Sequence, residues 1–197
     1  MALQMISTPL YMHAVGKSVT TQVDSDWDAL VGPSPVPRIA TQNDDREQTG
    51  NRRRMVVPSA IRTYVLAGKS IFTLVSLKTG ARFTYKVRHK DADSQRGTGD
   101  IYFVSVLTGP NNDCDYEYLG CLFDSGERFV HGKKSRIQIT SPSSMGFRYF
   151  WEKLGATGAV SAGIEFWHEG RCGRCNRLLT VPESLATGFG PECAGKL

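Results

Sequence analysis

Three cysteines near the C-terminus have the spacing of metal ligands. Cys172 and Cys175 are two residues apart, Cys193 follows after seventeen more residues, and His168 lies just upstream. A Cys-x-x-Cys turn brings two sulfurs to one side of a tight loop, and a later Cys or His can complete a tetrahedral Zn²⁺ site. The spacing therefore predicts zinc as the cofactor, bound by Cys172, Cys175, Cys193 and His168.

The fourth ligand decides what the zinc can do. The closeness of His168 to Cys172 favours ligation by the imidazole, and Cys121, Glu192 and water are the alternatives. Four protein ligands would make the site structural, whereas a bound water would leave the open position that catalytic zinc sites keep.

The residues between the cysteines predict a compact fold. Thr180 and Glu183 have the spacing of a capping box, Pro182 is suited to a first helical turn, and Gly188 is suited to a helix end. So short a segment buries little apolar surface, and we expect metal binding to supply the missing folding free energy.

Enzyme motifs are scarce in the sequence. It contains no Walker loop and no Gly-x-Ser-x-Gly elbow. Zinc deaminases keep their His-x-Glu far from the Cys-x-x-Cys, but here His168 and Glu169 lie only four and three residues before Cys172. The βαβ pattern expected around a redox-active Cys-x-x-Cys is also missing. These patterns favour a structural metal site over an enzyme.

Composition and charge indicate a soluble chain with a basic body. The 197 residues are 40% hydrophobic and 22% charged, which is ordinary for one or two globular domains. Residues 1–51 carry three basic and six acidic side chains, a net charge of −3, whereas residues 52–197 carry 21 basic and 13 acidic ones, a net charge of +8. The basic part is compatible with an anionic partner such as DNA or RNA, and equally with a solvated surface.

The five cysteines and the lengths of the apolar runs indicate the cellular compartment of the protein. An odd number of cysteines clustered at one end indicates metal ligands in a reducing compartment, with Cys114 and Cys121 expected as small buried side chains. No apolar run approaches the ~18 residues of a membrane span, and residues 1–10 lack a signal-peptide layout. We expect a cytoplasmic protein without a membrane partner.

The order of periodic segments predicts an α+β fold. A short helix over residues 58–67 precedes five antiparallel strands over residues 70–77, 81–90, 101–107, 116–123 and 128–130. Ser141 and Pro142 then open a helix to about Leu154. We expect a tail over residues 1–55 that is disordered or partner-dependent, a β-rich domain over 56–155, and a zinc-knuckle module, similar to a zinc ribbon or treble clef, over 156–197.

Two basic segments are candidates for phosphate binding. Within residues 81–90 the apolar side chains share one face of the predicted strand, and the other face carries Arg82, Lys86, Arg88 and Lys90. Lys133, Lys134 and Arg136 lie in a short glycine-containing loop further along the chain. The alternative is that the strand cations only keep a sheet face soluble. Phe72, Tyr102, Tyr116 and Tyr118 are either stacking platforms for bases or core residues.

The C-terminal run resembles a known module. Residues 172–180, Pro182-Glu183-Ser184 and residues 188–194 look like a small uncharacterised cysteine-rich module that is widespread in bacteria, plasmids and phages. The segments at 72–76 and 81–88 are similar to regions that accompany it in phage and mobile-element proteins. The resemblance supports Cys172, Cys175 and Cys193 as ligands, conveys no established activity, and implies the host-cell cytoplasm as the location.

Three functions follow from these observations. The first is a zinc-stabilised nucleic-acid-binding protein of a phage or mobile element. The second is a phage or plasmid protein that binds a host or phage protein as an adaptor or inhibitor. The third is an enzyme with an open zinc position.

Overall fold

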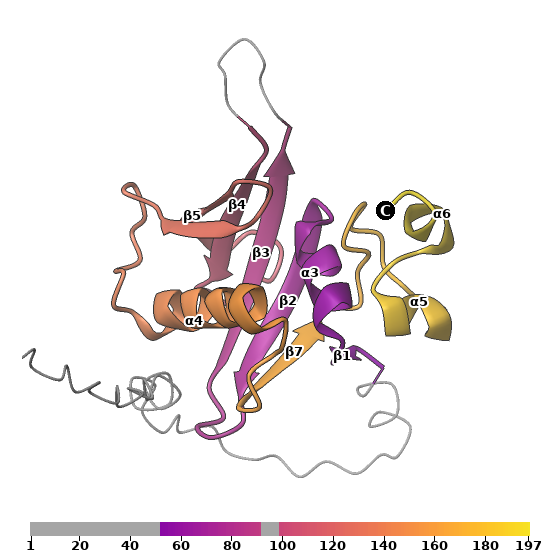
Figure 1. The fold of residues 1–197 in the computed structure, drawn as a ribbon, viewed down its shortest axis with the longest axis horizontal. Helices are drawn as coiled ribbons and strands as arrows, with labels where there is room; N and C mark the ends of the chain where they lie inside the picture. Colours follow the sequence, from indigo (N-terminus) through magenta and orange to yellow (C-terminus); the bar gives the residue numbers. More distant parts are fainter. Residues whose placement is uncertain (1–51, 92–98) are drawn as a thin grey trace, which may run out of the picture.

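The computed structural model describes residues 52–91 and 99–197. Seven strands form one antiparallel sheet with the order β1-β7-β2-β3-β4-β5-β6 (Figure 1). The strands are β1 (Arg54–Met55), β2 (Lys69–Ser76), β3 (Arg82–Lys90), β4 (Ile101–Leu107), β5 (Tyr116–Phe123), β6 (Arg128–His131) and β7 (Ile164–His168). The helices are α3 (Pro58–Leu66), α4 (Pro142–Thr157), α5 (Pro182–Thr187) and α6 (Pro191–Ala194). The predicted α+β class is confirmed, and the tail predicted over residues 1–55 lies, up to residue 51, outside the described residues.

One face of the sheet packs against α3 and α4. The core joins Tyr64 of α3 and Phe150 of α4 to Phe72, Tyr85 and Phe166 of the sheet, and all five side chains are at most 1% exposed. Aromatic side chains of this size dominate the burial free energy of a core. Ser141 caps α4 as predicted, because its side chain accepts a hydrogen bond from the Ser144 N–H.

The sheet has two strands more than the five that the sequence predicts. β7 lies in the sheet between β1 and β2, with Phe166 opposite Leu74 and Met55. The predicted module at 156–197 therefore begins before a strand of the main sheet. Arg54 lies in β1 and forms an ion pair with Glu165 at 3.2 Å.

The opposite face of the sheet is the open face. Its side chains alternate along each strand with the side chains that point into the core. Most of them are half-buried or exposed, and Ile71 and Cys121 are the buried exceptions in the described strands. The strand register places these side chains on the open face: Thr73, Val75, Arg82, Thr84, Lys86, Arg88, Lys90, Phe103, Ser105, Tyr116, Tyr118, Glu165 and Trp167.

Candidate metal centre and basic sheet face

The three predicted cysteine ligands come together in the structure. The sulfurs of Cys172, Cys175 and Cys193 all lie within 4.8 Å of one another. Cys172 and Cys175 belong to a turn before α5, and Cys193 lies in the short helix α6. Three thiolates at these distances can surround one metal ion, since a Zn–S bond of about 2.3 Å allows neighbouring sulfurs to be that close.

A narrow hairpin holds the first two cysteines. The Cys172 N–H donates to Arg177 O and the Asn176 N–H donates to Cys172 O, both at 2.8 Å, and Arg171 pairs with Leu178 as an antiparallel bridge. Asn176 closes the turn with a φ of 65°. Asparagine is one of the few residues other than glycine that adopts this left-handed conformation readily.

The hairpin also prepares one thiol for metal binding. Burial opposes ionisation of Cys172, but backbone N–H groups of Cys175, Gly190 and Arg174 point to its sulfur and the net effect lowers its pKa. Burial and hydrogen bonds from the neighbouring cysteines raise the pKa of Cys193 to about 11. Ionisation of one thiol makes ionisation of its neighbours less favourable, because like charges repel. A bound cation offsets this repulsion.

Tyr64 of α3 attaches this hairpin to the sheet. Its hydroxyl lies 3.0 Å from Arg171 O and 3.1 Å from Ile71 O, and its proton is shared between these two carbonyls. The ring packs edge-on against Phe189 at a centroid distance of 5.8 Å. The sequence places Tyr64 on the buried side of its helix, but gives no signal that it contacts the cysteine segment.

Two glycines allow the segment to approach Tyr64. A Cβ on Gly188 would lie 2.6 Å from Tyr64 Cδ2, and one on Gly173 would lie 2.9 Å from the same atom. Gly188 also ends α5 with a φ of 77°. The predicted helix end at Gly188 is confirmed, whereas the predicted capping box is wrong: Val181 is the N-cap of α5 and no side chain caps it.

Substituting Gly188 tests this packing. We expect Gly188→Ala to lower the free energy of unfolding by about 2–4 kcal/mol, because the methyl group clashes with the Tyr64 ring and alanine is strained at this φ. Gly190→Ala is the matched control, since its nearest neighbour to an added Cβ is Leu179 Cδ2 at 4.0 Å and its φ is −71°. Urea unfolding of both variants measures the difference, and equal stabilities would contradict the packing.

The structure does not bring His168 to the cysteines. Its side chain points into the core from β7 and is 1% exposed. The Gly170 N–H donates to Nδ1 at 3.1 Å, so Nε2 carries the proton and donates to Leu185 O at 2.7 Å. Burial lowers the pKa of His168, which keeps the ring neutral as these two bonds require. The imidazole therefore positions α5 and the residue before the hairpin.

The zinc content of a His168 variant distinguishes a positioning role of this residue from a role as metal ligand. We expect His168→Gln to bind the same amount of zinc as the unaltered chain. Its free energy of unfolding should be lower by about 1–3 kcal/mol, because the glutamine cannot keep both buried hydrogen bonds. Metal analysis and urea unfolding on one preparation give both values. Loss of zinc from a variant that stays folded would instead assign His168 as a ligand.

A cavity of about 240 Å³ adjoins the three cysteines. Its walls include Leu179, Val181 and Pro191, together with Glu192, one of the alternative fourth ligands. Cys121, another alternative, lies in β5, where its sulfur is 3.2 Å from the Tyr118 hydroxyl. Cys121 is buried as expected, whereas the expectation for Cys114 is wrong, because that residue is exposed.

The strand cations lie on one face, as the sequence predicts. Arg82 and Lys90 are exposed, Lys86 and Arg88 are half-buried, and Tyr85 and Val87 between them are in the core. Lys86 has local partners: its Nζ donates to Asp113 O at 2.9 Å and lies 3.6 Å from the centre of the Tyr116 ring. Burial, with the charge of Arg88, lowers the pKa of Lys86.

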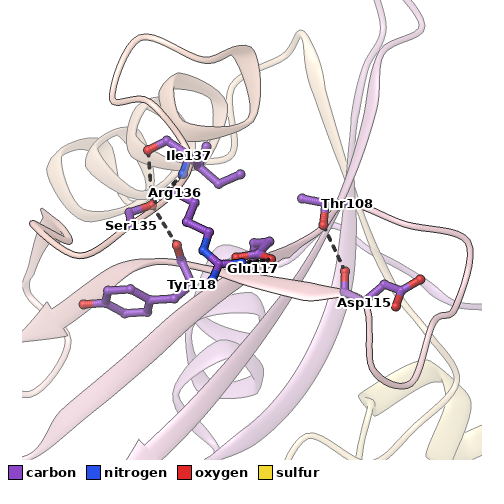
Figure 2. Close-up of polar contacts among 7 residues, drawn as sticks. All are labelled: Thr108, Asp115, Glu117, Tyr118, Ser135, Arg136 and Ile137. Atoms are coloured by element: carbon purple, nitrogen blue, oxygen red, sulfur yellow. Dashed lines mark hydrogen bonds and ion pairs between the residues drawn. The ribbon is translucent and has the colours of Figure 1, made fainter.

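The second basic segment borders the open face next to Tyr118. Ser135 Oγ donates to Tyr118 O at 2.7 Å, and Arg136 forms an ion pair with Glu117 at 3.6 Å (Figure 2). A Cβ on Gly132 would lie 2.3 Å from the Tyr118 ring. Lys133 and Lys134 follow that contact and are exposed.

Aromatic residues divide between the core and the open face. Phe72 and Tyr102, two of the predicted stacking residues, are buried with the core, whereas Tyr116 and Tyr118 are half-buried on the open face. The sequence reasoning missed Phe103 and Trp167, which also lie on this face. The alternation of Ile164, Phe166 and His168 with Glu165 and Trp167 is the signal that would have shown both β7 and its exposed tryptophan.

Comparison with known proteins covers only the C-terminal segment. A model described as a family of unknown function, DUF6011, matches residues 166–197, which include all three cysteines. The predicted resemblance of this segment to an uncharacterised family is thereby confirmed. No curated protein matches the chain. No solved structure matches it.

None of the helices in residues 52–91 and 99–197 combines the length and the apolar character that a bilayer span requires.

Proposed function

We propose that this chain is a nucleic-acid-binding accessory protein of a phage or mobile element, with a C-terminal segment held by Zn²⁺. The proposal rests on one observation: on the open face of the sheet, aromatic side chains lie between the two basic segments. Arg88 lies opposite Phe103 in the sheet, and the Phe103 and Tyr118 ring centres are 6.3 Å apart. The loop with Lys133 and Lys134 adjoins Tyr118 on its far side.

The choice of Zn²⁺ rests on the donor set. Three cysteine sulfurs are soft ligands, which favour zinc over the oxygen-seeking magnesium and calcium. The metal would connect the hairpin after β7 with α6, two segments that contribute few apolar side chains of their own. A structural role follows, because metal-binding free energy then becomes folding free energy of this segment.

The choice of nucleic acid rests on the mixture of side chains. Cations alone are ordinary on the wet face of a sheet. Here Arg88 lies opposite Phe103, which is 37% exposed, and the loop with Lys133 and Lys134 adjoins the half-buried Tyr118. Proteins that bind single strands combine a positive groove with aromatic rings on which bases stack. The proposed contact residues are Arg82, Lys86, Arg88, Lys90, Lys133, Lys134 and Arg136.

A salt series tests this proposal. Fluorescence anisotropy of labelled single-stranded DNA, single-stranded RNA and duplex DNA is measured against the zinc-loaded protein from low to physiological salt. We expect the logarithm of affinity to fall linearly with the logarithm of salt concentration, because phosphate contacts release counterions. No binding to any of the three probes at low salt would refute the proposal and favour a protein partner.

A second candidate function follows from the cavity beside the cysteines. A metal held by three thiolates has a fourth position, and the cavity gives an external ligand access to it, as in catalytic zinc sites. Cobalt substitution tests this possibility, since the visible bands of Co²⁺ report its ligands. A spectral shift on adding imidazole would indicate an open position, and an unchanged spectrum would indicate a closed structural site.

A further inference from the structure

We infer that a hollow on the open face, beside Trp167, is a binding site for one unpaired nucleobase of a single-stranded nucleic acid. The hollow has a volume of about 300 Å³ and is lined by Trp167, Glu169, Thr73, Arg53 and Arg82, among others. The inference rests on the proposed function and deepens it, because it specifies which form of nucleic acid binds and which bases are preferred.

The indole of Trp167 is held in a fixed orientation at the wall of this hollow. Its Nε1–H donates to Glu165 Oε2 at 3.0 Å, and the other oxygen of Glu165 is 3.2 Å from Arg54 of β1. Trp167 is half-buried, so part of its surface is available to a ligand. A base that stacks on a preorganised ring loses little entropy, and any base can do so because every base has a π-face.

A chain of hydroxyl groups positions a carboxylate in the same hollow. Thr73 Oγ1 donates to Glu169 Oε1 at 2.5 Å, and the Thr84 hydroxyl, 2.7 Å from Thr73 Oγ1, must then donate to Thr73. Glu169 keeps acceptor capacity for a ligand, since an ionised carboxylate has about four acceptor sites. An acceptor of this kind selects bases that present an amino group, as a glutamate does with N4 of cytosine.

Two arginines give the hollow donors for a phosphate or a base carbonyl. Arg53 and Arg82 both line the hollow, and Arg82 is exposed at the start of β3. A guanidinium carries five N–H donors in a planar arrangement that suits phosphate and carbonyl oxygens. The arginines and carboxylates together suit a base with both donor and acceptor groups and a phosphate beside it.

These contacts exclude a paired base. In a duplex the π-faces are covered by stacking, so Trp167 could not stack on a base, although the second amino hydrogen of cytosine or adenine stays accessible in the major groove. Sequence-dependent contacts of this kind require an unstacked base. The inference therefore predicts preference for single strands, and among them for cytosine, adenine or guanine over thymine or uracil.

The test compares strands and variants by fluorescence anisotropy. The probes are (dC)8, (dT)8, the corresponding RNA octamers, a duplex of equal length and cytidine monophosphate. The unaltered protein should bind (dC)8 more tightly than (dT)8 or the duplex. Trp167→Leu should weaken (dC)8 binding by about 5- to 150-fold, the range of one lost stacking contact. It should leave duplex binding unchanged, and Trp167→Phe should retain most of the affinity.

Glu169→Gln tests the contact with the edge of the base separately from the stacking contact. A glutamine can still accept from Thr73 through its oxygen, and its amide group would then donate to a base carbonyl. The preference for (dC)8 over (dT)8 should shrink or reverse in this variant. Thermal unfolding and zinc content confirm that each variant is folded, and Leu77→Ala, at a position 55% exposed outside the hollow, is the control for an altered apolar surface.

The outcomes separate this inference from the proposed function. Binding of all strands with unaltered affinity in Trp167→Leu would overturn the base site and leave the nucleic-acid proposal standing. Equal affinity for cytidine monophosphate and (dC)8 would assign the hollow to a free nucleotide and overturn the strand site. The absence of binding to every probe would overturn both.

Discussion

Replacing Cys175 with serine should abolish zinc binding and unfold the C-terminal segment while the sheet remains folded. Cys175 is the informative position because its side chain is exposed, whereas Cys172 is 1% exposed and its substitution would also disturb the core. Two thiolates and a weakly binding hydroxyl hold zinc poorly. Structural zinc contributes about 10–16 kcal/mol of apparent binding free energy in zinc-finger peptides, so the folding free energy lost by the segment should be large.

Metal analysis and hydrogen exchange measure the two parts of this prediction. The unaltered chain should carry about one zinc per molecule and Cys175→Ser almost none. Amide protection should fall over residues 171–197 and stay high in β2 to β5, where the core aromatics do not depend on the metal. Cys114→Ser is the matched control, because Cys114 is also exposed and lies outside the cluster. Equal zinc content in the two variants would refute the site.

The sequence predicted best those helices and strands whose own residues show the apolar alternation or the capping residues. β3 is an example, since alternation of Tyr85 and Val87 with charged residues is enough to identify a strand with one buried face. Ser141 and Pro142 likewise mark the start of α4 by local chemistry. The five predicted strands all occur, with ends shifted by at most one residue. Local signals of this kind need no knowledge of the partner.

Elements defined by a distant partner were harder to predict. β7 follows a run of small residues that resembles a linker, and its identity depends on pairing with β2 almost a hundred residues earlier. β1 contains only two residues. His168 is close to Cys172 in sequence, but alternation along β7 turns its side chain into the core and away from the cysteines. Proximity along the chain is therefore a poor guide to ligation when a strand lies between.

The cysteine cluster and the open face are linked through β7. Its inward side chains Phe166 and His168 contact Tyr64, which supports the cysteine hairpin. Its outward side chains, Glu165 and Trp167, belong to the open face. Loss of metal should therefore disturb the Trp167 side of the open face more than the Tyr118 side, because β2, β3 and β4 separate β5 from β7.

Replacing both Arg82 and Arg88 with glutamine should weaken single-strand binding by about 10- to 100-fold at low salt, because each arginine would lose a charge-assisted bond to phosphate. Both side chains project from the same face of β3, and Arg82 also lines the hollow beside Trp167. The slope of log affinity against log salt should become shallower by about 1.4, since each phosphate contact on a single strand contributes about 0.7. Anisotropy across the salt series gives both numbers.

The control must remove the same charge from a different face. Arg148 and Lys153 lie on α4, which covers the opposite side of the sheet, and the exposed Arg148–Glu152 ion pair contributes little to stability. Arg148→Gln with Lys153→Gln should leave the salt slope within error of the unaltered protein. If both double variants lose affinity equally, binding follows net charge alone. If only the Arg82 and Arg88 double variant loses affinity, the phosphates bind on the open face. The slope of log affinity against log salt depends on the number of phosphate contacts and not on the overall charge.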